Sequence, residues 1–153
     1  MGQRINMQEI HPEAYKALIN LAGTVGRSNL TPIQTHLIKI RTSIMNSCAY
    51  CIDMHTKEAL KIGETQQRIF LIPAWREASV FTDEERALLA LTEEVTIIHQ
   101  KGVSEKTYSE AEQFFSPDAI ADIIMETISM NSLNRMVVST RFGRHVKPRV
   151  VHH

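Results

Sequence analysis

Two cysteines and one histidine are the side chains in this sequence whose types and spacing point most directly to chemistry. Cys48 and Cys51 are separated by two residues, a spacing that can close a short disulfide, and His55 follows four residues after Cys51. These are the only two cysteines in a chain of 153 residues. A thiol is nucleophilic as its thiolate, which a nearby base or positive charge favours near neutral pH. The pattern therefore indicates thiol-based redox chemistry assisted by an imidazole.

The three side chains fall on one face if their segment is helical. Successive helical residues turn by about 100°, which places Cys51 and His55 within about 60° of Cys48. The apolar Ile62 falls in the same arc, so this face is predicted to point inward. Glu58 lies at its edge, one turn beyond His55, where it could orient the ring. Burial raises a thiol pKa, but a helix N-terminus and an imidazolium lower it, and we expect the lowering effects to prevail for at least one sulfur.

Three other interpretations of the pair are possible. Cys48, Cys51 and His55 could supply three zinc ligands, with His36 or His99 as the fourth if folding brings either close. Ligand pairs in structural zinc sites usually lie on knuckles or loops, which makes zinc less favoured. Buried cysteines can also simply pack as small hydrophobic residues. A thioredoxin-like domain is disfavoured, because its cysteine pair belongs to a βαβ unit and no segment here has the pattern of a strand.

The elements that must position these side chains are all predicted to be helices. Apolar residues recur at spacings of three and four between clear start and stop signals. Seven helices are predicted to begin near Pro12, Thr31, Asn46-Ser47, Glu64, Thr82, Ser104 and Ser116. Thr31 with Gln34, and Thr82 with Glu85, have the pattern of a capping box. Gly63 is predicted to end the helix that carries the cysteines.

Length and composition indicate one all-α domain, a bundle of about six to seven helices. We predict that this domain spans residues 1–143 and that residues 144–153 form a loose tail. Seventeen basic and seventeen acidic side chains balance, so that no electrostatic reason favours nucleic acid or an anionic membrane as partner. No signal peptide or apolar run of about eighteen residues is visible, which predicts a cytoplasmic protein. In that compartment a cysteine pair more often carries out redox chemistry or binds a metal than forms a structural disulfide.

The last predicted helix is apolar around much of its circumference. Ile120, Ile124 and Ile128 gather on one side, while Met125 and Met136 lie off it. A helix this apolar needs cover on more than one side, and a near-zero net charge removes a barrier to self-association. We therefore expect a homo-oligomer.

Residues 41–63 resemble the core motif of the alkylhydroperoxidase D-like proteins, which belong to the carboxymuconolactone decarboxylase superfamily. The motif reads RTSIMNSCAYCIDMHTKEALKIG in this chain. The similarity continues through residues 64–67, 73–77 and 81–96, and more weakly through 131–135, so it covers most of the chain. It is therefore much more specific than an isolated cysteine pair.

The resemblance implies an all-helical homo-oligomer, commonly a trimer or hexamer and sometimes a dimer of such units. It also implies a thiol-dependent peroxidase or disulfide reductase that works without heme, flavin or metal. By motif, Cys51 is the attacking thiolate, Cys48 is the resolving partner, and His55 belongs to a proton relay. The implied partners are a hydroperoxide substrate and a dithiol or protein thiol reductant.

This chain departs from the family pattern twelve residues before Cys48. Better-studied members carry a relay glutamate there, whereas this chain has His36, whose imidazole could take that role because it titrates near neutral pH. Glu93 or Glu94 could also substitute for the missing acid. Tyr50 stands where some members carry a histidine inside the pair, which removes one candidate base.

The sequence thus predicts a peroxidase that reduces hydrogen peroxide or organic hydroperoxides through Cys51, Cys48, His55 and His36. Three alternatives remain open at this point. The first is a reductase or redox partner for protein or lipoyl disulfides. The second is a decarboxylase-like or lactone-handling enzyme, disfavoured because such members need no redox cysteine pair. The third is a non-catalytic oligomer whose cysteines only pack.

Overall fold

The computed structural model describes residues 2–143, which form nine α-helices and one short 3-10 helix and contain no strand. The predicted all-α class is confirmed for this part of the chain. The elements are α1 (Met7–Ile10), α2 (Pro12–Val25), α3 (Pro32–Met45), α4 (Ala49–Lys61), α5 (Gln66–Leu71), η1 (Ile72–Ala74), α6 (Asp83–Thr96), α7 (Ile98–Lys101), α8 (Glu105–Glu112) and α9 (Pro117–Thr140). The tail predicted for residues 144–153 lies outside the described residues.

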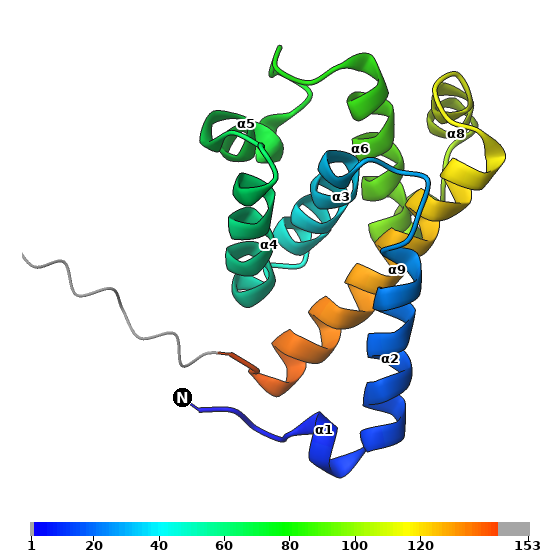
Figure 1. Ribbon diagram of the computed structural model, residues 1–153. Helices are drawn as coiled ribbons and strands as arrows, with labels where there is room; N and C mark the ends of the chain where they lie inside the picture. The colour runs from blue at the N-terminus through cyan, green and yellow to red at the C-terminus, as the bar shows by residue number, and fades with distance from the viewer. Residues whose placement is uncertain (1, 144–153) are drawn as a thin grey trace, which may run out of the picture.

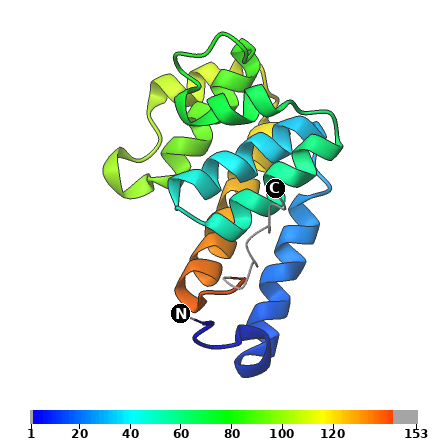
Figure 2. The same ribbon diagram turned by 90° about the vertical axis from the view of Figure 1, so that its left-hand side faces the viewer.

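Helix α3 is the centre of the packing, because it contacts α4, α6 and α9. Leu37, Ile38 and Ile40 of α3 are buried in the main core together with Leu88 and Leu91 of α6. The long helix α9 crosses the domain and continues past it, with α2 running alongside in the opposite direction (Figures 1 and 2). Among residues 2–143 no helix is both long and apolar enough to span a bilayer.

The predicted helix starts are confirmed where a side chain caps the backbone. Thr31 accepts a hydrogen bond from the backbone N–H of Gln34, and the Gln34 side chain accepts one from the N–H of Thr31. Thr82 and Glu85 form the same reciprocal pair at the start of α6. Gly63, at φ 101°, follows the end of α4, as predicted. These local hydrogen bonds explain why the first residues of α3 and α6 could be predicted from the sequence.

The junction between α3 and α4 differs from the prediction. Asn46-Ser47 was expected to cap the next helix, but Cys48 is the N-cap residue of α4 and makes no side-chain capping hydrogen bond. Ser47 has φ 54°, and the N–H groups of Cys48 and Ser47 donate to the carbonyls of Ser43 and Ile44, at 2.9 and 3.1 Å. This is a Schellman motif that ends α3, and it places Cys48 directly at the N-cap position of α4.

Replacing Ser47 by glycine is expected to raise the free energy of unfolding by about 0.5–1 kcal/mol. A left-handed conformation costs an L-residue roughly 1–2 kcal/mol, part of which glycine's larger unfolded-state entropy offsets. Urea denaturation of S47G and of the matched variant S47A measures the effect. Because alanine keeps the Cβ atom, S47A should show no gain, and an equal gain in both variants would contradict this account.

Two features of the helices were missed or misplaced. Helices α1 and α7 have only four residues each, too few for apolar periodicity to predict them. Ile62 was expected on the inward face with the cysteines, but it is the C-cap residue of α4 and is 42% exposed. Helical phase does not apply to a residue at which the helix has ended.

Candidate active site

The cysteine pair lies at the buried N-terminal end of α4. Cys48 and Cys51 are joined by a disulfide and are 0% and 2% exposed. Cys51 is the third residue of α4, within the first turn, where backbone N–H groups lack helical partners. Such a position favours negative charge, which would stabilise a thiolate once the disulfide is reduced.

His55 lies one helical turn beyond Cys51 and, as predicted, faces inward; it is 5% exposed. Its Nδ1 atom is 3.0 Å from Oε2 of Glu58. The same oxygen lies 3.4 Å from Nε2 of His36, which comes from α3. The two imidazole rings are 6.3 Å apart between centroids, in an edge-on arrangement. The structure therefore brings His36, His55 and Glu58 together around one carboxylate oxygen.

The electrostatics of the cluster suit His55 to act as a base. Burial lowers the pKa of His55, and the charge of Lys39 adds to this effect, although the hydrogen bond with Glu58 opposes it. Burial alone would raise the pKa of Glu58, but its hydrogen bond with His55 and the charge of that imidazole hold this pKa below its usual value. The outcome is a neutral imidazole beside an ionised carboxylate, the arrangement that lets a histidine accept a proton.

Two cavities flank the disulfide. Cys51 and His55 line the first, which has a volume of about 200 Å³ between α2, α4 and α9. Its apolar lining residues include Ile19, Met54, Met130, Leu133, Met136 and Val137. Cys48 lines the second, of about 420 Å³, together with Ser47, Ala49, Asp53 and Val138. Tyr50 and Phe142 border both cavities and are in edge-on contact, with ring centroids 5.1 Å apart.

Polar side chains of α9 hold the turn that carries Cys48. Asn46 donates hydrogen bonds to the side-chain oxygens of Asn131 and Asn134, at 2.9 and 3.1 Å. The Asn134 side chain is fully buried and donates in turn to the hydroxyl of Ser43. From the sequence, residues 131–135 show only a weak resemblance to the family, and their contact with this turn was not predicted. The signal that the sequence offers for this role is the pair of asparagines, Asn131 and Asn134, three residues apart on the last helix.

Neither candidate substitute for the relay glutamate takes part in this cluster. Glu93 accepts hydrogen bonds from Arg41, Trp75 and Arg76, and Glu94 accepts them from Ser104 and Thr107. The expectation that either could complete the relay is therefore wrong. Glu58, which the sequence predicts only to orient His55, is the carboxylate that contacts both histidines.

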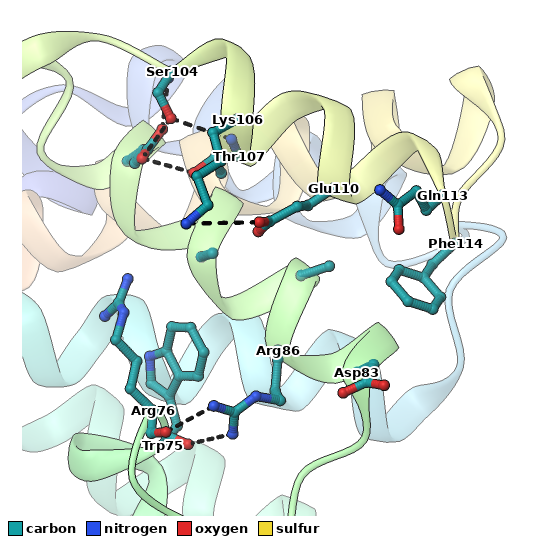
Figure 3. A pocket seen from close by; sticks show the side chains of 13 residues that line it. Trp75, Arg76, Asp83, Arg86, Ser104, Lys106, Thr107, Glu110, Gln113 and Phe114 are labelled. Carbon is teal, nitrogen blue, oxygen red and sulfur yellow. Dashed lines mark hydrogen bonds and ion pairs between the residues drawn. The ribbon is translucent and has the colours of Figure 1, made fainter.

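A larger cavity, of about 690 Å³, lies away from the thiols between α6 and α8 (Figure 3). Its cationic side chains serve local structure. Arg86 donates to the backbone carbonyls of Trp75, Arg76 and Ala78, and Lys106 lies 3.9 Å from Glu110. This cavity contains neither thiol nor imidazole, and we assign it no role in the chemistry.

The carboxylate of Glu126, on α9, is buried near Lys39 of α3. It is 2% exposed, its Oε2 atom has no hydrogen-bond partner, and its Oε1 atom is 3.9 Å from the Lys39 ammonium. Burial raises the pKa of Glu126. The charges of Lys39 and His36 lower this pKa in part, and the charge of Asp122 raises it further. The folded chain therefore holds this proton more tightly than the unfolded chain.

The substitution Glu126→Gln is expected to stabilise the protein more at pH 8 than at pH 5. Since the folded-state pKa is raised, wild-type stability falls as pH rises from the usual glutamate pKa through the folded value. The variant lacks this loss, which amounts to about 1.4 kcal/mol for each unit by which the pKa is raised. Urea denaturation of both proteins at the two pH values measures it. A stability difference that does not change with pH would contradict the raised pKa.

The chain belongs to the carboxymuconolactone decarboxylase family, whose sequence pattern matches residues 12–94. It is 37% identical over 139 residues to YdfG of Bacillus subtilis (strain 168), an uncharacterised protein, with 91% of this chain and 95% of YdfG covered. The resemblance inferred from the sequence motifs is thereby confirmed at the level of the family.

Solved structures agree with this assignment. ATU0492 of Agrobacterium tumefaciens, a protein of unknown function named as a candidate antioxidant-defence protein AhpD, superposes with a TM-score of 0.89 at 39% identity over 92% of this chain and 97% of that one. The alkylhydroperoxidase AhpD core of an uncharacterised peroxidase-related protein from Ralstonia eutropha JMP134 has a TM-score of 0.75 at 20% identity, over 87% and 71% of the two chains. At that identity the second likeness shows the fold alone.

Proposed function

We propose that this protein is a thiol-dependent peroxidase that reduces hydrogen peroxide or organic hydroperoxides through a Cys48–Cys51 disulfide cycle. One observation carries the proposal. Cys51 and His55 line the same apolar cavity, and His55 is backed by the Glu58 carboxylate. This places a nucleophile and a base at one small-molecule pocket. The candidate AhpD assignment of ATU0492, at 39% identity, favours the same function.

The cycle begins when His55 takes the proton of the Cys51 thiol. The thiolate attacks the terminal oxygen of the hydroperoxide, so that an S–O bond forms and the O–O bond breaks. The imidazolium of His55 returns its proton to the departing alkoxide, which leaves as an alcohol. Cys51 is then a sulfenic acid, and Cys48 condenses with it to form the disulfide and release water.

His36 and Glu58 complete the relay in this proposal. Glu58 accepts a hydrogen bond from Nδ1 of His55, which leaves Nε2 free to take the thiol proton and stabilises the imidazolium that forms. His36 approaches the same carboxylate oxygen from α3, so that the cluster joins the two helices. Glu58 thus supplies the acid that the family pattern places at position 36.

The cavity lining favours an organic hydroperoxide with an apolar substituent. Its walls carry three methionines, Met54, Met130 and Met136, whose flexible side chains fit irregular apolar shapes. Hydrogen peroxide would gain nothing from these contacts. We therefore propose that the specificity constant is higher for an apolar organic hydroperoxide than for hydrogen peroxide.

Introducing a charge in this wall by Met136→Lys is expected to lower kcat/KM for cumene hydroperoxide by roughly tenfold or more and to change the value for hydrogen peroxide much less. Loss of apolar contact with a substrate is worth about 1–3 kcal/mol. Peroxide consumption with both substrates measures it. Ser139→Lys is the control, because Ser139 lies on the same helix, is exposed and does not line the cavity. Equal losses for both substrates would contradict the proposed specificity.

The cavity beside Cys48 is the proposed route for the reductant. A dithiol or a protein thiol must reach a sulfur of the disulfide, and this cavity is lined by Cys48, whereas the proposed substrate pocket is lined by Cys51. The same cavity supports the second candidate function, a reductase of protein or lipoyl disulfides. The two functions differ in whether the dithiol form reacts with peroxide.

The test uses the reduced protein, freed of excess reductant, and one equivalent of cumene hydroperoxide. The proposal requires that two thiols disappear for each molecule of alcohol formed, within seconds to minutes. Thiol titration and chromatography of the alcohol measure the two quantities. If the reduced protein does not react with the peroxide but does reduce lipoamide, the peroxidase proposal is overturned in favour of disulfide reduction.

We propose in addition that the chain forms a homo-oligomer through α9. Met125, Ile128 and Val138 of this helix are 38%, 41% and 41% exposed, an unusual share of apolar surface for one helix. Light scattering at micromolar concentration measures the mass in solution. A monomer there would contradict self-association.

A further inference from the structure

The cluster of His36, His55 and Glu58 contains the donor atoms of a metal site. Two imidazole nitrogens and one carboxylate oxygen lie within 4.8 Å of one another. The Glu58 oxygen is 3.0 Å from Nδ1 of His55 and 3.4 Å from Nε2 of His36. In tetrahedral zinc sites, ligand atoms about 2.0–2.1 Å from the metal are about 3.3 Å from one another. Two of the three separations are already close to that value.

The hydrogen bond that His36 makes through Nδ1 leaves its Nε2 atom available to bind a metal. Its Nδ1 atom is 2.8 Å from the carbonyl oxygen of Pro32, and since a carbonyl only accepts, Nδ1 must donate. Nε2 is therefore the ring nitrogen left to face the Glu58 carboxylate, and its lone pair is available to a cation placed between the two groups. A backbone carbonyl that holds the second ring nitrogen is also the usual means by which proteins orient a metal-binding histidine.

The surroundings allow a cation to enter. The Glu58 side chain is 44% exposed, and the His36 side chain is 15% exposed, so the site opens to solvent on their side. Lys39 also acts on this cluster electrostatically, but its ammonium group lies 3.9 Å from Glu126, a partner of opposite charge. Mixed imidazole and carboxylate donors suit Zn²⁺ and neighbouring transition metals.

We propose that His36 Nε2, His55 Nδ1 and the Glu58 carboxylate bind a divalent transition-metal cation of the Zn²⁺ class, with water in the fourth position. This site departs from the sequence-based expectation of no metal. It also differs from the zinc alternative based on Cys48 and Cys51, because the thiols are joined to each other. The metal is a regulator of the relay and not a cofactor of the reaction.

The regulatory effect rests on the proposed function. A neutral imidazole that binds a metal through Nδ1 carries its proton on Nε2. His55 in that state has no free lone pair with which to take the Cys51 proton. Metal binding would therefore suppress peroxide reduction reversibly, and a chelator would restore it.

Calorimetric titration of the oxidised, chelator-stripped protein with Zn²⁺ tests the site. The disulfide form is used because its sulfurs cannot compete for zinc. The site requires that His36→Ala and Glu58→Gln each weaken binding by more than about tenfold, since loss of even an outer-shell partner costs 10–100-fold. His99→Ala is the control for a histidine on a distant helix, α7, and should bind as the wild type does. Co²⁺ gives a second readout through the visible absorption of a tetrahedral site.

Unchanged zinc affinity in both His36→Ala and Glu58→Gln would overturn the metal site. The regulatory effect is tested by peroxide turnover with and without Zn²⁺, expressed for each protein as a fraction of its own metal-free rate because His36 belongs to the proposed relay. His36→Ala keeps both thiols and so controls for zinc binding to sulfur. Zinc should inhibit the wild type at least about tenfold more strongly than this variant. Equal inhibition of both proteins would overturn the regulation. Absence of turnover in metal-free wild type would instead overturn the proposed function, while calorimetry alone still decides the site.

Discussion

Replacing Cys51 by serine is expected to lower the rate of hydroperoxide reduction by roughly 10³-fold or more. The serine hydroxyl stays protonated near neutral pH, so the helix N-terminus and His55 no longer have an anionic nucleophile to stabilise. Removing a catalytic nucleophile from other enzymes costs up to about 10⁶-fold in kcat. Stopped-flow consumption of cumene hydroperoxide under a dithiol reductant measures the loss.

Cys48→Ser is the matched variant, because it removes the other sulfur of the same pair. It is expected to retain a rapid reaction with one equivalent of peroxide, since Cys51 can still form a sulfenic acid. Continuous turnover should fall strongly, because the resolving thiol is absent. Mass spectrometry of the product should find one added oxygen on Cys51. If Cys48→Ser loses the first reaction while Cys51→Ser keeps it, the two roles are reversed.

The relative positions of three residues of this cluster could be predicted from the sequence because all three lie on α4. Cys51, His55 and Glu58 are related by helical spacing alone, and the structure confirms that both Cys51 and His55 are buried and that Glu58 reaches the imidazole. His36 was identified through its distance from Cys48 in a family motif. Its contact with Glu58 could not be predicted, because it depends on how closely α3 packs against α4.

The features that could not be predicted depend on tertiary packing, or on a residue type that is uncommon at its backbone conformation. The cavity lined by Cys51 and His55 has walls from α2 and α9, which no local pattern relates to α4. At the junction of α3 and α4, the left-handed residue is Ser47, where a glycine would have signalled a Schellman motif. The capping boxes at Thr31 and Thr82 were predictable because all of their hydrogen bonds lie within four residues.

Glu93 shows most clearly why residue type does not define a role. The sequence made it a candidate for the relay, but the structure places it where it joins α3, α6 and the segment after η1. Its Oε1 atom accepts hydrogen bonds from Arg41 Nε at 2.9 Å and Trp75 Nε1 at 2.6 Å, and its Oε2 atom accepts one from Arg76 at 2.5 Å. The Glu93 side chain is only 9% exposed and that of Arg41 is 15% exposed.

Glu93→Ala is therefore expected to lower the free energy of unfolding by about 3–5 kcal/mol. Removing one partner of a buried ion pair leaves the other charge uncompensated, and here the indole N–H of Trp75 also loses its acceptor. Urea denaturation measures the loss. Glu94→Ala is the control from the neighbouring position, and it should cost only about 1 kcal/mol, because Glu94 is half-buried and bonds neutral groups at the start of α8.

The same variant separates a structural carboxylate from a relay acid. If Glu93 only holds the helices together, Glu93→Ala measured well below its unfolding temperature should reduce peroxide at nearly the wild-type rate, because Glu58 and both histidines keep their places on α3 and α4. If Glu93→Ala unfolds at the same urea concentration as the wild type but has lost turnover, Glu93 would have to be a member of the relay. Stability and activity must therefore be measured on the same samples, since only the combination of a large loss in stability and a preserved rate assigns the relay to Glu58.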